Sequence, residues 1–126
     1  MKTHVEIEDA VSEGIRRFEQ EYIGRGPKAI HAHLIQDLLV VRLQGVLTAA
    51  EKQLVTAFDT GRGRDLLKQV RTHLIETSRL LIEAMIHDIT DVKAGSLHHD
   101  ISTVTGEELV VFTLATVPSL REVKPK

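Results

Sequence analysis

The pattern of apolar residues predicts an amphipathic helix over residues 5–23. Apolar side chains recur there at steps of three and four positions, and mostly polar and charged residues lie between them. This period places the apolar side chains on one face of a helix. Gly24 and Pro27 then predict the end of the helix, because glycine readily closes a helix and proline disfavours helical backbone in the residue before it. The apolar positions are Ile7, Val11, Ile15, Phe18 and Tyr22.

In the next two segments, successive side chains fall alternately on a more apolar and a less apolar face, and this alternation predicts a β-hairpin. Residues 28–35 alternate between two faces, and residues 38–44 continue the alternation after a two-residue turn. A period of two is that of a strand, and a turn this short joins antiparallel neighbours. In the first strand, one face carries Ile30, Ala32 and Leu34, and the other carries His31, His33 and Ile35.

The middle of the chain predicts two helices. Thr48 and Glu51 have the spacing of a capping box, in which each side chain accepts a hydrogen bond from a free amide at the helix start. A short helix is therefore expected to run to about residue 58. Gly61 and Gly63 interrupt it, and an apolar stripe then predicts a longer helix that reaches Ile89.

The second half of that longer helix carries more apolar residues than contact with one sheet face requires. Because a large exposed apolar surface is usually covered, the surplus predicts a homodimer. The residues expected at the dimer contact are Leu81, Ile82, Met85 and Ile86.

A second hairpin is expected near the C-terminus, from residues 91–101 and 107–115. The last strand is apolar on both faces, so we expect both faces to be covered. The predicted fold is α+β, in two layers: a four-stranded, mostly antiparallel sheet with helices on one face, in the order α-β-β-α-α-β-β. We expect a single domain over residues 1–126, with its core at about residues 5–115 and a polar tail at 116–126.

Composition narrows the classes of function. The net charge is only -2 and aromatic residues make up 3% of the chain, which argues against binding of nucleic acid. The sequence has no cysteine, so disulfides and thiolate metal sites are excluded. The N-terminus lacks the pattern of a signal peptide and no apolar run approaches the ~20 residues of a membrane span, so we expect a soluble, cytoplasmic protein without direct membrane insertion.

Four residues are candidate metal ligands. His31 and His33 share one face of the first predicted strand, and His98 and Asp100 belong to the second hairpin. Imidazole and carboxylate are common ligands of zinc, and three of these ligands could meet if the two hairpins were neighbours. The alternative is that they are ordinary surface side chains.

Two glycine-containing segments carry cations and are candidate sites for an anion or an acidic partner. Arg25 and Lys28 follow Gly24, and Arg62 and Arg64 flank Gly63. Free backbone amides beside cations often hold phosphate or carboxylate groups. The simpler interpretation is that the glycines end one helix and begin another.

No catalytic site is complete in the sequence. His98, His99, Asp100 and Ser102 lie close together along the chain, but neighbouring residues of a strand point to opposite faces and no nucleophile elbow is present. We therefore expect neither a catalytic residue nor a cofactor, and the chain is more consistent with a binding module than with an enzyme.

The order of several motifs resembles the MpsC-like family, named after the C component of a sodium-translocating, membrane-potential-generating system. The resemblance covers about residues 15–114 and implies a small cytoplasmic bacterial protein, loosely linked to a membrane complex for ion or inorganic-carbon uptake. The chain departs from the family pattern at His99, Val104 and Glu108. The motifs are residues 24–27, 40–48 with Glu51, Gly61-Arg62, His98, residues 100–102, 105–107 and 110–112.

These observations favour a non-enzymatic accessory or regulatory module that acts through protein–protein contact, with a protein of a membrane complex as a possible partner. The alternative is a sensor of a small ligand, an anion or a metal.

Overall fold

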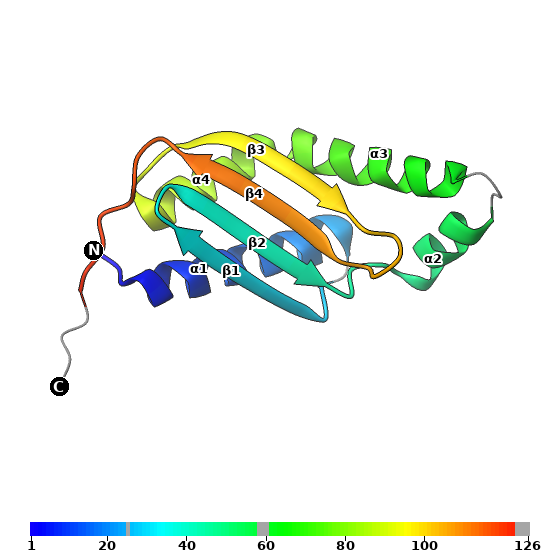
Figure 1. Ribbon diagram of the computed structural model, residues 1–126, viewed down its shortest axis with the longest axis horizontal. Coiled ribbons are helices and arrows are strands. Elements are labelled where there is room, and N and C mark those ends of the chain that lie inside the picture. The colour runs from blue at the N-terminus through cyan, green and yellow to red at the C-terminus, as the bar shows by residue number, and fades with distance from the viewer. Residues whose placement is uncertain (25, 58–60, 123–126) are drawn as a thin grey trace.

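Four strands form one antiparallel sheet with helices on one of its faces (Figure 1). The computed structural model describes residues 1–24, 26–57 and 61–122. The strand order is β1-β2-β4-β3, so the last strand inserts beside the first hairpin and leaves β1 and β3 at the two edges. The strands are β1 Ala29–Ile35, β2 Leu38–Gln44, β3 Ala94–Ile101 and β4 Glu108–Leu114.

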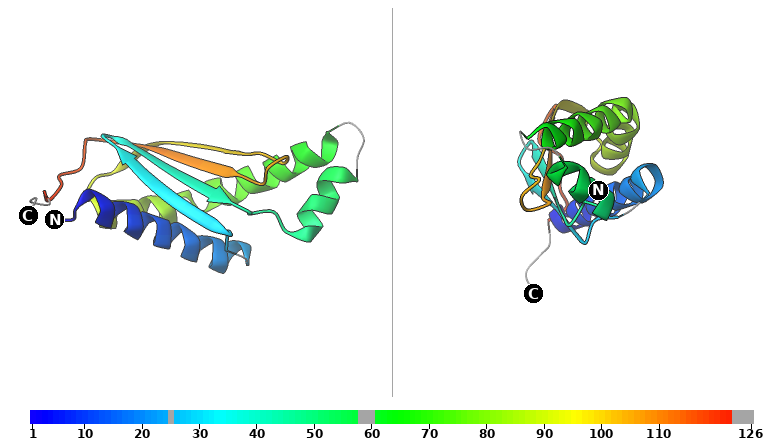
Figure 2. Two further views of the ribbon diagram at one scale, coloured as in Figure 1. Left: turned by 60° about the horizontal axis from the view of Figure 1, so that its bottom comes forward. Right: turned by 90° about the vertical axis from the view of Figure 1, so that its right-hand side faces the viewer.

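The helices lie behind the sheet, as the turned views in Figure 2 show. In Figure 1, α2 and the start of α3 extend past the end of the strands. None of the described helices combines the length and the apolarity that crossing a bilayer requires. The elements are α1 His4–Phe18, the π-helix η1 Glu19–Ile23, α2 Ala49–Thr56, α3 Arg62–Thr77 and α4 Arg79–Thr90.

The periodicity of apolar side chains in the sequence explains which residues form the core. On β1 the residues Ile30, Ala32 and Leu34 are buried against the helices, while His31 and His33 are exposed on the open face. The apolar stripe of α1 is buried in the same core. The α+β class, the antiparallel sheet and the helices on one face are thus confirmed.

The predicted long helix is divided at Ser78, so the predicted element order holds when α3 and α4 are taken as one interrupted helix. The Thr77 hydroxyl donates to the carbonyl of His73 one turn earlier. Such bonding competes with the regular helical ladder and bends helices. Both parts nevertheless bury side chains in the core, among them Leu67 and Ile75 from α3 and Ile82 and Ile86 from α4.

Both edges of the sheet are covered by polar side chains. Along β1, the amide of Ala32 donates to Ser12 Oγ at 3.0 Å and the amide of Leu34 donates to Glu8 Oε2 at 2.8 Å. Along β3, Arg79 Nη2 donates to the carbonyl of Gly95 at 3.2 Å. Bonds of this kind occupy groups that would otherwise pair with a strand of another chain. Contact with another protein is therefore expected through the faces of the domain.

The segment predicted as a polar tail folds back on the N-terminus as far as residue 122. The Arg121 amide donates to the Lys2 carbonyl at 2.9 Å, and Arg121 Nη2 lies 2.8 Å from Glu6 Oε1. Glu6 also completes the capping box of α1 with Thr3. Hydrogen bonds from Thr3 and Arg121 lower the pKa of Glu6 to about 2, which indicates a carboxylate held in its charged form.

Gly63 allows α3 to pack closely on α2, and a side chain at this position should separate the two helices. A β-carbon on Gly63 would collide with the carbonyl oxygen of Leu54, and a backbone atom cannot turn aside as a side chain can. We expect Gly63→Val to lower the free energy of unfolding by about 1–3 kcal/mol in urea titrations, as overpacking does. Gln69→Val, at an exposed position of the same helix, should change it by less than about 0.5 kcal/mol. Equal effects of the two variants would contradict this account of the contact.

Candidate functional site

An arginine is buried in the core, where it meets carboxylates from three other elements. The Arg71 side chain on α3 is only 2% exposed. Glu19 begins η1, Glu51 lies in the first turn of α2, and Glu108 begins β4. We call these four residues, together with His99 on β3, the buried charge cluster. The cluster therefore joins every layer of the fold.

Arg71 is held most firmly by Glu51. Its Nε lies 3.2 Å from Glu51 Oε2 and its Nη2 lies 3.1 Å from Glu51 Oε1, a two-pronged geometry that is favourable for an arginine–carboxylate pair. Nη2 also donates to the carbonyl of Val46 at 3.0 Å. The contacts with Glu19 and Glu108 are longer, at 3.6 and 3.9 Å from Nη1.

His99 extends the cluster to the edge strand β3. Its Nε2 lies 2.8 Å from Glu108 Oε2, and both side chains are almost fully buried. Two of the three residues at which the chain departs from the family pattern, His99 and Glu108, thus contact each other. Arg71 Nη1 and His99 Nδ1 make no hydrogen bond within the described part of the protein. Buried polar networks add stability only when they are well satisfied, so this cluster is not explained by stability alone.

The cluster retains a proton on Glu19. Burial raises the pKa of Glu19 to about 9, and the charge of Glu108 and a hydrogen bond with it act in the same direction, against Arg71. Burial would also raise the pKa of Glu108, but its hydrogen bond and attraction to His99, helped by Glu19 and Arg71, lower that pKa below the ordinary value. At neutral pH the pair is therefore one acid, Glu19, beside one carboxylate, Glu108.

Sequence reasoning missed this cluster. The signal was present in the periodicity. Glu19 continues the buried stripe of Ile7, Val11 and Ile15 at steps of four, and Arg71 stands midway between the buried residues Leu67 and Ile75. Charged residues at core positions of a regular pattern are the mark of a buried ionic network.

The charge cluster has the properties of a proton-binding site more than those of a catalytic centre. The main surface pockets of the described residues are lined by other side chains. A substrate would need access to the acid and the base, whereas a proton requires only small movements. The chemistry the geometry supports is therefore the gain and loss of a proton.

A groove between α1, η1 and α4 is a mainly apolar hollow of the described surface. Its volume is about 160 Å³, and its walls include Phe18, Tyr22, Leu81 and Met85. Phe18 and Tyr22 stack, with ring centroids 5.1 Å apart. Tyr22 and Leu81 keep 53% and 50% of their area exposed. Contiguous exposed apolar surface makes the groove a candidate interaction site.

The four residues expected at a dimer contact differ in their burial. Ile82 and Ile86 are buried in the core of their own chain, at 2% and 0% exposure, although Ile82 also forms part of the groove wall. Leu81 and Met85 do line the groove. Their neighbour Leu80, which belongs to the same apolar stripe, is 82% exposed.

The candidate metal ligands are not brought together. His31 and His33 share the open face of β1 as expected, but His98 and Asp100 lie on β3 at the opposite edge. The two intervening strands separate these edges by about 14 Å. Asp100 Oδ1 instead accepts a hydrogen bond from Lys68 Nζ at 2.9 Å. Nowhere in residues 1–24, 26–57 and 61–122 do three or more such side chains form a metal-binding group.

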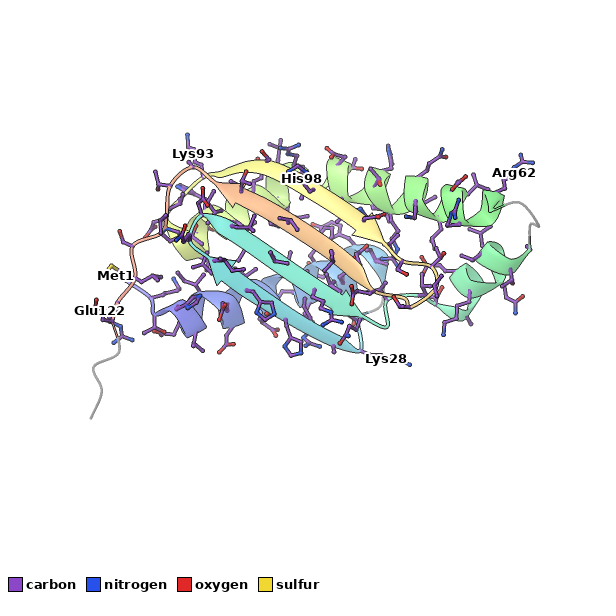
Figure 3. All side chains as sticks on the ribbon, viewed as in Figure 1. Met1, Lys28, Arg62, Lys93, His98 and Glu122 are labelled. Carbon is purple, nitrogen blue, oxygen red and sulfur yellow. The ribbon has the colours of Figure 1, made fainter. Side chains whose placement is uncertain are left out.

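The candidate anion-binding cations are also dispersed. Figure 3 places Lys28 beside the first strand and Arg62 at the far end of α3. The stem of Lys28 packs over Gly45, and Arg64 Nε lies 3.2 Å from Asp65 Oδ1 in an exposed pair. Arg25 lies outside the described residues. Of the described cations, Lys28 therefore lies apart from Arg62, as expected for two separate segments.

One expectation about β4 is wrong, because one face of the sheet is open. Both faces of this strand were expected to be covered, but the helices cover only one. On the other face Leu109 is 37% exposed and Val111 is half-buried. The sheet therefore has a second partly apolar surface, broader and flatter than the groove.

Comparisons with known proteins identify relatives of the chain. A family model described as "Na+-translocating membrane potential-generating system (MpsC)" matches residues 3–116. Uncharacterized protein YbcI of Bacillus subtilis (strain 168) is 34% identical over 113 residues, which cover 90% of this chain and 89% of YbcI. Uncharacterized protein YrhF of the same organism is 28% identical over 89 residues, covering 63% of this chain and 70% of YrhF. No solved structure matches the chain.

Proposed function

This chain belongs to the MpsC family, and we propose that it is a non-enzymatic accessory or regulatory module that acts through protein–protein contact as a homodimer. The groove between α1, η1 and α4 is the observation that carries the proposal, because it presents exposed apolar side chains between two helices. The family description further motivates the proposal that the dimer serves a membrane ion-translocating system.

A second copy of the chain fits the groove because the charges at its rim complement themselves. Arg17 and Glu21 both line the groove, one turn apart and with opposite signs. Neither has an ion-pair partner within the described residues. A twofold contact places residue i against j and residue j against i, so Arg17 of each chain can face Glu21 of the other. The same symmetry brings the apolar walls of both grooves together.

A charge at the centre of the groove should disrupt the dimer. We expect Leu81→Glu to raise the dimer dissociation constant by about tenfold or more in sedimentation equilibrium, because it buries an unpaired carboxylate in the contact. Val104→Glu is the matched control, since Val104 is 94% exposed in the turn between β3 and β4. If both variants associate like the wild type, the groove is not the contact. Loss of the dimer on Val40→Glu but not on Leu81→Glu would place the contact on the open sheet face instead.

Charge reversal tests the pairing of Arg17 with Glu21. Arg17→Glu should weaken association by about two- to tenfold, because it sets two carboxylates against each other at each end of the contact. The double variant with Glu21→Arg should restore association, since the exchanged charges face each other again across a twofold axis. A double variant that is as weak as the single one would show that the two residues do not meet.

A further inference from the structure

The buried charge cluster and the groove have one short segment, η1, in common. Glu19 is the first residue of η1 and belongs to the cluster, while Tyr22 lies three residues later and lines the groove. The segment has π-helical hydrogen bonding, and the Gly24 amide donates to the Glu19 carbonyl at 3.1 Å. Short π-helical turns are rare and occur frequently at functional sites. Any movement of Glu19 is therefore transmitted directly to the wall of the groove.

The charges around Glu19 make its ionisation costly. Glu51 and Glu108 face it from α2 and β4, Arg71 faces it from α3, and His99 stands behind Glu108 on β3. Arg71 already has its two-pronged contact with Glu51. A new charge on Glu19 would add a third carboxylate to one arginine in a buried site. Repulsion from Glu108 would then favour movement of Glu19 toward water.

We infer that the proton on Glu19 sets the conformation of η1, so that loss of this proton displaces Tyr22 and reshapes the groove. The consequence for pairing of two chains rests on the function proposed above. The device would make the contact surface responsive to alkaline conditions, with the neutral form of Glu19 holding the groove as described. The segment that moves is limited to η1, because α1 remains anchored by its own apolar stripe.

Tyr22 provides a specific reporter, because it is the single tyrosine of the chain and the sequence has no tryptophan. We would record its near-ultraviolet circular dichroism from about pH 6.5 to about pH 9.5, below the ordinary pKa of tyrosine. The wild type should show a transition with a midpoint near pH 9, the pKa of Glu19. Glu19→Gln keeps a hydrogen-bond donor for Glu108 but cannot ionise, so its signal should show no such transition. Glu13→Gln, at an exposed position of α1, should behave like the wild type.

A second variant distinguishes the loss of ionisation at Glu19 from a structural effect of Glu19→Gln. Glu108→Gln removes the neighbouring charge that raises the pKa of Glu19, so the transition should move to lower pH. A purely structural role of Glu19 predicts no such displacement. Identical curves for the wild type and Glu19→Gln, with far-ultraviolet spectra that show both folded, would overturn the inference.

Sedimentation of the same samples separates this inference from the proposed function. The dimer dissociation constant of the wild type should rise by about tenfold between neutral pH and about pH 9.5, and that of Glu19→Gln should stay constant. A dimer with constant affinity and a constant Tyr22 signal would overturn the inference and leave the proposed function intact. A Tyr22 transition in a chain that never dimerises would contradict the proposed function and support the switch in η1.

Discussion

Replacement of Arg71 by alanine is expected to lower the free energy of unfolding by about 3–5 kcal/mol, the usual cost of removing one partner from a buried ionic network. The guanidinium is the positive charge that Glu51 and Glu108 face in the core. Without it, these carboxylates must ionise without a partner, take up protons or move into water. Chemical denaturation at pH 7 measures the loss, and a chain that no longer folds is the upper limit of the same effect.

Two comparisons distinguish this effect from a general cost of shortening an arginine. Arg64→Ala, on the same helix but exposed, should change the free energy of unfolding by no more than about 0.5 kcal/mol. Adding Glu108→Gln to Arg71→Ala should cost less than the sum of the two single changes, because neutralising Glu108 removes one of the unpaired charges. Additive effects would show that Arg71 and Glu108 do not interact in the folded protein.

The second large effect concerns Glu19 and the pH dependence of stability. The pKa of Glu19 is about 9 in the folded chain, against an ordinary value of 4.5. Between these two values the folded protein keeps a proton that the unfolded chain releases, so the contribution of Glu19 to stability is greatest below pH 4.5 and falls as the pH rises toward 9. We expect Glu19→Gln to remove this dependence. At pH 9 the variant should be more stable than the wild type by about 2–4 kcal/mol, whereas at pH 5 the two should differ by less than about 1 kcal/mol.

Urea titrations at several pH values test this expectation, with Glu13→Gln as the exposed control. That variant should follow the wild type at every pH, because Glu13 lies at the surface. Parallel curves for all three proteins would show that Glu19 ionises normally in the folded state. The buried charge cluster would then need a different explanation.

Much of the fold was accessible from the sequence because its local signals agree with one another. Thr48 and Glu51 form the predicted capping box, with bonds of 2.9 and 3.1 Å. Gly24 takes the left-handed conformation, at φ 88°, that ends the first helix. The alternation of β1 and β2 matches their observed bounds within one residue. In each case a few neighbouring residues determine the local structure.

The features that the sequence did not reveal depend on contacts between distant residues. The strand order separates His31 from His98, and no local pattern specifies which hairpin strand lies beside β2. Ile82 and Ile86 are taken up by the core because α4 lies flat against α1, an orientation set by the break at Ser78. Arg71 was missed because its position in the buried stripe, between Leu67 and Ile75, was not considered.

Sedimentation velocity of the unmodified chain tests the central claim most directly, at concentrations from about 1 to about 100 micromolar, where contacts of modest size associate. Our account predicts a species of twice the 14.1 kDa of one chain, which grows with concentration at neutral pH. A single species of 14.1 kDa over the whole range would contradict it.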